Sequence, residues 1–340
     1  MTNDTSLPPS LKILEITYSN FVIARALYAF AKLGIADLLR DKALRSEELA
    51  SPAGVAPGAL YRLLRTLSTA EVVSESQDHR FTLGPLGEAL RSDAPGSMRA
   101  WAIFSGEPFY LQAWEQIVHT IQTGQPAWEH VHKMPIFEYI GQHPEAAQIF
   151  DQAMTSLSAG EAPAIVEAYD FVGIRKLADI GGGQGLMLRT ILRSHPKMAG
   201  VLFDRPDALQ GTQELLVQEE LAHRCEVVPG DFFQSVPQGA DAYLLKYVIH
   251  DWDDERSVAI LRNCRRAMTN DARLLLVETV VPRPGEAHFA KLQDLEMLVV
   301  AGSQERTVDE YSHLLERAGF TLIRVLPTTE PASILEAAPK

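Results

Sequence analysis

The sequence predicts a mixed α/β chain with a helical N-terminal part and a C-terminal part built on a mostly parallel, seven-stranded sheet. Three observations support this prediction. From about residue 170, short β-rich runs alternate with helical stretches, as in a parallel sheet covered on both faces. Before that point the chain is helical and rich in aromatic residues. Two final β-rich runs flank a Thr-Thr-Glu-Pro turn and predict a terminal antiparallel hairpin.

Length and composition set the broad class. A chain of 340 residues is expected to form two domains, and its net charge of −13 argues against nucleic-acid binding, which depends on cationic contacts to phosphates. The two cysteines, Cys225 and Cys264, lack metal-type spacing and favour a reduced, intracellular protein. The polar start "MTNDTSLPPS" does not resemble a secretory signal, and no apolar run has the length of a membrane span. We therefore expect a cytoplasmic protein without a membrane partner.

The first part of the chain, residues 1–98, reads as a helical winged-helix module. Residues 10–40 are helical, and the stretch "FVIARALYAFAKLGIADLL" is apolar around much of its circumference, which favours burial against a second subunit. Helices are then expected at 46–51 and 57–70, followed by a hairpin around "SQDHR". We expect this module to form a homodimer through its N-terminal helices.

A winged helix also raises the alternative of a ligand-sensing, DNA-binding regulator. The helix that would read DNA offers only Arg62 and Arg65, and the helix before it carries Glu47 and Glu48. A DNA-reading face needs more basic and polar side chains than this. A packing or dimerisation role is therefore preferred.

Residues 99–168 are expected to connect the two parts as a series of short helices. Prolines at 108, 126, 135 and 144 divide the region. Aromatic side chains at helical spacing serve either as core or as the wall of a pocket for a flat ligand, and the sequence leaves both open.

The stretch "LADIGGGQGLMLRTIL" joins a predicted strand to a predicted helix through four glycines. Either alignment with the dinucleotide pattern G-x-G-x-x-G puts a leucine at the third glycine. The spacing present is Asp179-x-Gly181-x-Gly183-x-Gly185. This acidic-x-Gly-x-Gly-x-Gly loop is typical of proteins that bind S-adenosyl-L-methionine (SAM). Glycines allow the backbone to lie against its methionine portion, and Asp179 offers a carboxylate to its cationic groups.

Two further acids follow successive strands. Asp204 ends the run "VLFD" and suits the ribose hydroxyls, as an acid does in dinucleotide folds. Asp231, in "VVPGDFF", can accept from the adenine amino group while Phe232 packs against the base. Three acids at the ends of three strands after such a loop make SAM the predicted ligand.

The fourth strand runs into "LLKYVIHDWDDE", which places His250 beyond the carboxyl end of a strand. Ligands of open α/β sheets bind at that edge. A phenol needs a base that titrates near neutrality to become a nucleophile, and His250 is the candidate. Glu278 ends the fifth strand and Glu305 lies in "GSQERT". Either carboxylate could accept from the far nitrogen of His250.

The acids that follow His250 have two interpretations. Asp251, Asp253 and Asp254 could form a metal cluster, or they could cap the helix that follows and stabilise its N-terminal dipole. The capping interpretation is preferred, and no metal is expected.

These motifs resemble those of a known family, the homodimeric, metal-independent O-methyltransferases of the plant caffeic-acid type, which has natural-product members in bacteria. The resemblance covers nearly the whole chain and implies a Rossmann-like SAM-methyltransferase domain at 169–340. It also implies SAM contacts from Gly181, Asp204, Asp231, Phe232 and Lys246. His250 resembles the family's general base, flanked by Glu278 and Glu305. The family's substrate pockets imply wall residues at Phe150, Met154 and Asp294. The stretch "DRPDAL" departs from the usual Asp-Leu-Pro, because Arg205 follows Asp204.

The sequence thus predicts a SAM-dependent O-methyltransferase that acts on a hydroxyl of a small aromatic, natural-product-like substrate. Three alternatives stay open: a SAM-binding relative that hydroxylates or decarboxylates, the winged-helix regulator, and a metal-dependent methyltransferase. The identity of the acceptor, and whether its reacting atom is O, N or C, are not decided by these motifs.

Overall fold

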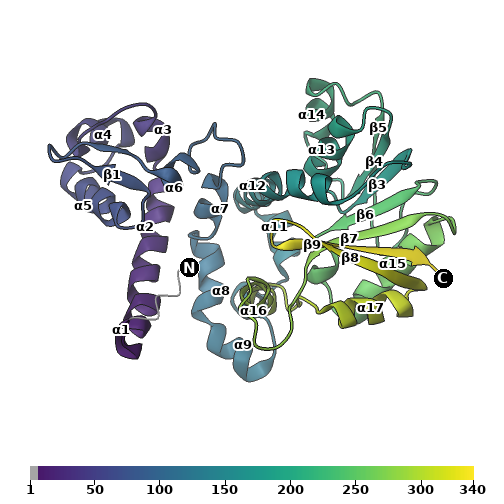
Figure 1. The fold of residues 1–340 in the computed structure, drawn as a ribbon. Coiled ribbons are helices and arrows are strands. Elements are labelled where there is room, and N and C mark those ends of the chain that lie inside the picture. Colours follow the sequence, from purple (N-terminus) through teal and green to yellow (C-terminus); the bar gives the residue numbers. More distant parts are fainter. Residues whose placement is uncertain (1–6) are drawn as a thin grey trace. The chain divides into compact units, whose positions relative to one another are not determined.

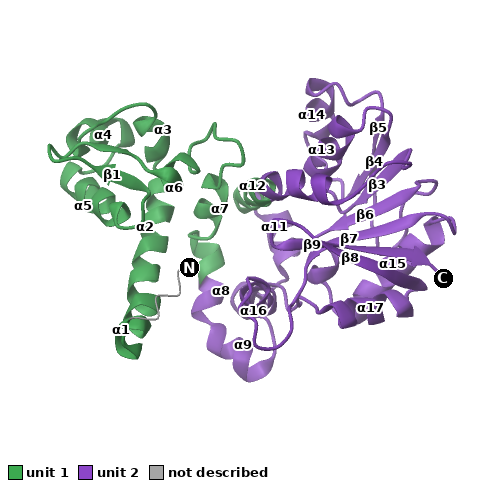
Figure 2. Ribbon diagram, in the orientation of Figure 1, with its two compact units in different colours: residues 1–111, 145–157 green, residues 112–144, 158–340 purple. Residues whose placement is uncertain are grey.

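The computed structural model describes residues 7–340, which divide into two compact units (Figures 1 and 2). Unit 1 contains the residues up to 111 together with 145–157, and unit 2 contains 112–144 and 158–340. Most of the polar start of the chain, from which we expect no secretory signal, lies outside the described residues. The three-part division at residues 98 and 168 stays a prediction.

Unit 1 begins with a nearly continuous run of helices, as predicted for residues 10–40. The run consists of α1 (Pro9–Leu14), the π-helical segment η1 (Glu15–Ser19), α2 (Asn20–Lys32) and α3 (Ile35–Leu39). One side of α2 buries Ala26, Phe30 and Ala31 in the unit. Seven large apolar side chains near the start remain exposed: Leu7, Leu11, Ile13, Leu14, Ile16, Tyr18 and Phe21.

The predicted helix–turn–helix and hairpin also form in unit 1. They comprise α4 (Ser46–Ala53), α5 (Pro57–Ser68) and the antiparallel pair of β1 (Val73–Glu75) and β2 (Phe81–Leu83). Gly54, at φ +67°, ends α4 in the left-handed conformation that glycine adopts without strain. The short helices α6 (Pro85–Glu88) and α7 (Arg99–Phe104) follow.

The helices between the two parts begin where the prolines predict. Pro108 opens α8 (Pro108–Glu115) and Pro144 opens α12 (Pro144–Ala168). Pro126 and Pro135 directly precede the other two proline-marked helices, α10 (Ala127–His132) and α11 (Ile136–Gln142); α9 (Ile117–Thr123) lies before them. Proline is tolerated at a helix start because the missing N–H has no helical acceptor there.

Unit 2 contains the predicted seven-stranded sheet, in the order β5-β4-β3-β6-β7-β9-β8 (Figure 1). The first five strands of this order are parallel, and β9 lies antiparallel to both β7 and β8. The strands are β3 (Lys176–Ile180), β4 (Ala199–Asp204), β5 (Cys225–Pro229), β6 (Ala242–Lys246), β7 (Arg273–Thr279), β8 (Phe320–Pro327) and β9 (Ala332–Pro339). The connecting helices are α13 (Leu186–Ser194), α14 (Thr212–Gln218), α15 (Asp254–Ala267), α16 (Ala290–Val300) and α17 (Val308–Arg317).

Both faces of the sheet are buried, as parallel sheets require. Along β3, Ala178 and Ile180 join the core on one face, and Leu177 joins the core on the other. The strand order reverses at β3, whose neighbours are β4 on one side and β6 on the other. The carboxyl end of β3 is therefore a topological switch point, where open α/β sheets bind ligands.

Among residues 7–340, no helix is long and apolar enough to cross a membrane.

Candidate active site

The glycine loop follows β3 at this switch point. Gly181, Gly183 and Gly185 have φ of +73°, +56° and +73°, a backbone region that residues other than glycine rarely adopt. The loop is tied to β4 because the Gly181 N–H donates to the Phe203 carbonyl at 2.8 Å. Gly185 is the residue from which α13 starts.

The three glycines differ in what surrounds them. A Cβ on Gly181 would lie 2.8 Å from Val248 Cγ2, and one on Gly185 would lie 2.7 Å from Leu202 Cδ2. These two glycines therefore allow close packing of the loop on the sheet. A Cβ on Gly183 would meet nothing within 4 Å. The backbone at Gly183 is the part of the loop against which a ligand can lie.

Asp179 lies within β3 and is 1% exposed. Burial, and then the charge of Asp204, raise the pKa of its carboxyl to about 7. Its Oδ2 has no hydrogen-bond partner among the described residues. A buried carboxylate oxygen without a partner is costly unless a donor or a cation reaches it. This fits the prediction that Asp179 meets the cationic groups of SAM.

Asp204 ends β4 and faces the glycine loop. Its Oδ2 accepts from the Gly183 N–H at 2.7 Å, and its Oδ1 accepts from the Arg205 N–H at 2.7 Å. Burial raises the pKa of the carboxyl. The Arg205 side chain pairs with Asp207 Oδ2 at 3.0 Å, so its guanidinium is partnered outside the loop.

The loop after β5 places Asp231 and Phe232. Asp231 is exposed, and its carboxylate accepts from the Phe233 N–H at 2.8 Å and the Gln234 amide at 3.2 Å, which shapes a tight turn. The Phe232 ring is half-buried and lies edge-on to the Trp252 ring, with centroids 6.0 Å apart. Phe232 thus presents an aromatic surface beside Trp252, a residue that sequence analysis did not assign.

Lys246 ends β6 and is ion-paired in the described structure. Its Nζ lies 2.9 Å from Glu161 Oε2, and it donates to Ser158 Oγ at 3.2 Å. The next residue, Tyr247, has φ +52° and donates its hydroxyl to Glu161 Oε1 at 2.7 Å. Glu161 could not be predicted from the sequence, because nothing in the sequence of α12 distinguishes it from other helix residues.

His250 lies on the short 3-10 helix η2 (Ile249–Asp251), directly after β6, and is 7% exposed. Its Nδ1 is 2.7 Å from Glu305 Oε1, and its Nε2 is 3.4 Å from Asp251 Oδ1. Of the two carboxylates predicted to orient this ring, Glu305 makes the contact. Glu278 instead accepts from the backbone N–H of Ile249 at 2.9 Å and so holds the segment that carries His250.

The charges of this cluster are coupled. Burial alone lowers the pKa of His250, but Asp251 and Glu305 outweigh it and raise the pKa above its ordinary value. Burial raises the pKa of Asp251 to about 6 and that of Glu278 to about 7. The imidazole is therefore a stronger base than the near-neutral one expected from the sequence, because the carboxyl groups of Asp251, Glu305 and Glu278 lie around it.

The acids considered as a metal cluster have separate contacts. Asp253 caps α15 by accepting from the Arg256 N–H at 2.8 Å, as the capping interpretation predicts. Asp254 pairs with Arg306, and Asp251 faces His250. A different group of side chains lies close enough to hold a metal ion: one possible ligand atom each from His250, Glu278 and Glu305 lies within 4.8 Å of the other two. One imidazole and two carboxylates form a donor set that a divalent metal accepts.

The three predicted substrate residues lie in different places. Asp294, on α16, accepts from the Glu305 N–H at 2.9 Å and is thereby part of the His250 surroundings. Phe150 and Met154 are half-buried on the part of α12 that belongs to unit 1, where the Phe150 ring contacts Phe104. Their role in substrate binding stays a prediction.

Comparison with known proteins gives consistent matches over the whole chain. The profile of the O-methyltransferase domain matches residues 114–321, and that of the O-methyltransferase dimerisation domain matches residues 16–93. Phenazine O-methyltransferase of Lysobacter antibioticus is 43% identical over 99% of this chain and 98% of that protein. The 8-amino-8-demethylriboflavin N,N-dimethyltransferase of Streptomyces davaonensis is 37% identical over 92% and 91%.

One solved structure is similar over nearly its whole length. It is an O-methyltransferase (NcsB1) from neocarzinostatin biosynthesis, in complex with S-adenosylmethionine and 2-hydroxy-5-methyl naphthoic acid. It is 30% identical, covers 94% of this chain and 96% of that chain, and superposes with a TM-score of 0.79.

Proposed function

This chain belongs to the family of SAM-dependent O-methyltransferases, and we propose that it methylates a hydroxyl group of a small aromatic natural product with His250 as the general base. The observation that carries the base assignment is the buried contact of His250 Nδ1 with Glu305 Oε1 at 2.7 Å. With its Nδ1 proton donated to that carboxylate, the ring leaves Nε2 free to accept a proton.

The raised pKa of His250 suits this role. A phenolic hydroxyl ionises near pH 10, so a neutral imidazole whose pKa lies above the usual histidine value takes that proton with a smaller energetic penalty. The same raised pKa keeps the ring protonated at low pH, so methylation should increase with pH as the ring becomes neutral. SAM, when bound, supplies a methyl group on a positively charged sulfur. His250 Nε2 would take the acceptor's proton as the oxygen forms its bond to that methyl group and S-adenosylhomocysteine leaves. Asp251, 3.4 Å from Nε2, then stabilises the imidazolium.

The donor site is proposed to comprise the acidic and glycine positions of the loop and the ends of the next strands. The unpartnered Oδ2 of Asp179, the open backbone at Gly183 and the aromatic surface of Phe232 support it. The proposed residues are Asp179, Gly181, Gly183, Gly185, Asp204, Asp231, Phe232 and Lys246.

An aromatic acceptor is supported by the relatives. Their names give a phenazine and a demethylriboflavin as substrates, and NcsB1 was solved with a naphthoic acid, so all three handle fused or substituted aromatic rings. One of them methylates nitrogen, which makes an amine the second candidate acceptor. Products analysed by mass spectrometry and NMR distinguish an O-methyl ether from an N-methyl amine. A hydroxylated or decarboxylated product would reject methyl transfer.

The base is tested by His250→Ala, with His313→Ala on the exposed face of α17 as the control. General-base assistance is worth about 10²–10⁴-fold, so we expect a loss of this size in single-turnover methylation for His250→Ala only. The dissociation constant of SAM, measured by calorimetry, should change little in either variant. Near-normal methylation by His250→Ala would reject the base assignment.

A metal role for His250, Glu278 and Glu305 is tested in parallel. Activity that persists after dialysis against excess EDTA supports the base. Activity that is lost on chelation and restored by one divalent cation would instead support a metal held by these three side chains.

We also propose that the chain forms a homodimer through its first helices. The exposed apolar side chains from Leu7 to Phe21 form a surface that water disfavours, and three of them, Ile16, Tyr18 and Phe21, lie within the dimerisation-domain match. Ile13→Glu with Phe21→Glu should convert a dimer to a monomer in light scattering. A monomeric parent protein would reject the proposal.

A further inference from the structure

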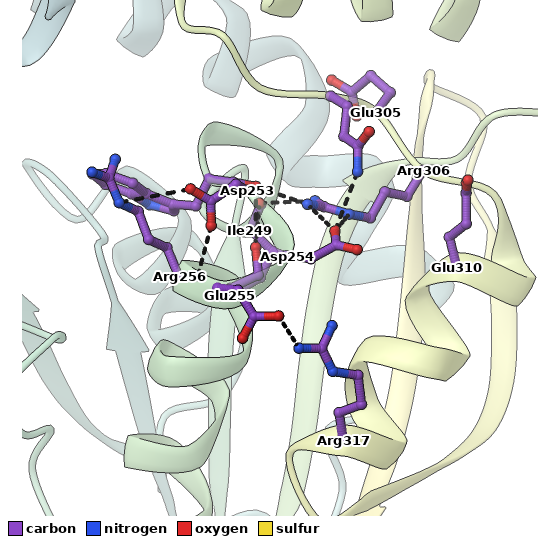
Figure 3. A network of polar contacts seen from close by, with 12 residues as sticks. Ile249, Asp253, Asp254, Glu255, Arg256, Glu305, Arg306, Glu310 and Arg317 are labelled. Atoms are coloured by element: carbon purple, nitrogen blue, oxygen red, sulfur yellow. Dashed lines mark hydrogen bonds and ion pairs between the residues drawn. The ribbon is translucent and has the colours of Figure 1, made fainter.

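The Arg306 side chain is fully buried and bonded to one short segment (Figure 3). Its Nη1 donates to the Ile249 carbonyl at 3.1 Å, and its Nη2 donates to the Trp252 carbonyl at 2.7 Å. Its Nε and Nη2 also reach Asp254 Oδ1 at 3.2 and 2.9 Å. One guanidinium thus holds three acceptors within six residues of the chain.

The segment that Arg306 holds contains His250, and Arg306 itself directly follows Glu305. The backbone at Arg306 is fixed to the end of β7, because the Val281 N–H donates to its carbonyl at 2.9 Å. Glu278, on β7, accepts from the Ile249 N–H. The strand end, the Glu305 segment and the His250 segment are therefore locked to one another through Arg306.

The chemistry of the site requires an arginine. Two backbone carbonyls and a carboxylate surround the group, and the planar fork of a guanidinium meets all three at once. Lysine would bring the same charge on a single nitrogen and could not span both carbonyls. Asp254 provides the balancing charge, and its side chain is 49% exposed, so the buried cation depends on backbone acceptors for the rest of its stabilisation.

We propose that Arg306 is a positioning residue that keeps the His250 ring against Glu305, and that it contributes to turnover without contacting either substrate. The part about turnover rests on the proposed role of His250 as the base. Loss of the fork frees the carbonyls of Ile249 and Trp252, and the segment between them then samples positions in which Nδ1 no longer meets Glu305. Such loosening lowers the rate of the chemical step and leaves SAM affinity nearly unchanged.

The pKa of His250 reports this positioning directly. The ring is faced by Asp251 from its own segment, by Glu305, by Glu278 from β7, and by the stacked Tyr247 ring at 5.1 Å. A ring that moves away from Glu305 loses part of the negative charge around it. Its pKa then falls toward the ordinary histidine value, provided the charge at position 306 is kept.

The test compares Arg306→Lys with Arg317→Lys, a matched change in an arginine of α17 that pairs with the exposed carboxylate of Glu255 on α15 (Figure 3). Both variants keep their charge. For each variant we would measure the rate of single-turnover methylation, the dissociation constant of SAM and the melting temperature. The pKa of His250 is measured by NMR on the ¹⁵N-histidine-labelled protein in the oligomeric state in which it is purified. We expect Arg306→Lys to lower the single-turnover rate by roughly 10- to 100-fold, which is the effect of displacing a residue that orients a catalytic group. We also expect this variant to lower the pKa of His250. Arg317→Lys should match the parent protein.

Asp254→Asn decides the matter if Arg306→Lys does not fold. This change weakens the bond between the half-exposed side chain at position 254 and the Arg306 guanidinium. It should lower the single-turnover rate and the pKa of His250, as Arg306→Lys does, but by a smaller amount. A His250 pKa and a rate that match those of the parent in the folded variant would overturn the inference. A shifted pKa with unchanged turnover, together with full activity of His250→Ala, would reject the base and keep the positioning. Double-variant cycles with His250→Ala should show no additional loss from Arg306→Lys.

Discussion

In the glycine loop, the residues proposed to bind the methyl donor lie in one stretch of seven, Asp179 to Gly185, and their arrangement depends on backbone conformation. Around His250 the arrangement differs, because the ring, Glu278 and Glu305 come from three segments far apart in the chain. The donor side depends on which positions lack a side chain. The region around His250 depends on charged groups that lie close together in the protein interior. The two regions should therefore fail in different ways when they are changed.

Among the changes that compare these two regions, the largest effect is expected from Glu305→Gln, which keeps the shape of the side chain and removes its charge. The amide can also donate toward His250, so the ring can adopt the unproductive tautomer. We expect kcat to fall about 10²-fold. Because a lost carboxylate lowers the pKa of His250, the rising limb of the pH–kcat profile should move to lower pH.

The profile is measured with SAM and acceptor saturating, alongside calorimetry of SAM binding. The SAM dissociation constant should stay within about twofold, because Glu305 lies on the base side. A limb that stays in place or moves to higher pH would contradict the proposed coupling of Glu305 to His250.

On the donor side, Gly183→Ala should weaken SAM binding more than it destabilises the fold. A Cβ here meets no protein atom within 4 Å, so only φ strain opposes it, about 1–2 kcal/mol, and the methyl group enters the space proposed for the ligand. We expect the SAM dissociation constant to rise roughly tenfold. Gly239→Ala, at φ +81° and equally open, is the control for strain alone.

The neighbouring Gly182→Ala should give the reverse result. Its Cβ would lie 2.5 Å from Leu202 Cδ1 and 2.6 Å from Asp179 Oδ2, both in the core. The melting temperature of Gly182→Ala should therefore fall, whereas the melting temperatures of Gly183→Ala and Gly239→Ala should stay close to each other. Equal effects of Gly182→Ala and Gly183→Ala on both SAM affinity and melting would remove the distinction between packing and ligand contact.

A smaller effect is expected from Asp179→Asn. Burial raises the pKa of this carboxyl to about 7, so the ionised group destabilises the ligand-free protein as the pH rises. Asparagine avoids this cost, and the melting temperature should rise by about 2–4 °C above pH 7. The gain should shrink as the pH falls from about 7 toward about 4, where both folded and unfolded chains hold the proton.

The same variant should bind SAM less tightly, since an amide cannot pair with its ammonium. A variant that is less stable at pH 8 and binds SAM as the parent does would show that Asp179 is structural only.

The smallest effect is expected from Arg205→Ala. The Arg205 guanidinium is partnered by Asp207 on the surface, and exposed pairs contribute about 0–1 kcal/mol. Its loss should change SAM affinity by about twofold or less, measured by calorimetry in low salt. A tenfold change would mean that this residue reaches the donor and that the departure from Asp-Leu-Pro matters for binding.

Much of the fold could be predicted because its signals are local. The order of strands and helices from β3 to β9, the prolines that open α8 and α12, and the cap at Asp253 all follow from short-range patterns. The cluster at His250 was only partly predictable. The sequence motifs predict the three side chains. They leave open which carboxylate orients the ring, because a sequence does not contain the distances from Glu278 and Glu305 to His250.

The residues that sequence analysis missed share one property. Glu161, Arg306 and Trp252 act through partners more than fifty residues away or through ring packing. Arg306 and Trp252 lie in the quoted stretches "GSQERT" and "LLKYVIHDWDDE", but the letters of those stretches do not say which distant groups they contact. Asp294 was named as a substrate wall residue, and the structure places it on the Glu305 backbone.

The sequence by itself determined the donor chemistry, since glycine spacing and strand-end acids act through backbone conformation that neighbouring residues dictate. Only the tertiary structure decided the base chemistry. The pKa of His250, its contact with Glu305 and the burial of Arg306 arise when segments from β6, β7 and the chain after α16 meet in the interior of the unit. Electrostatic effects depend on distance and desolvation, and the linear order of residues contains neither.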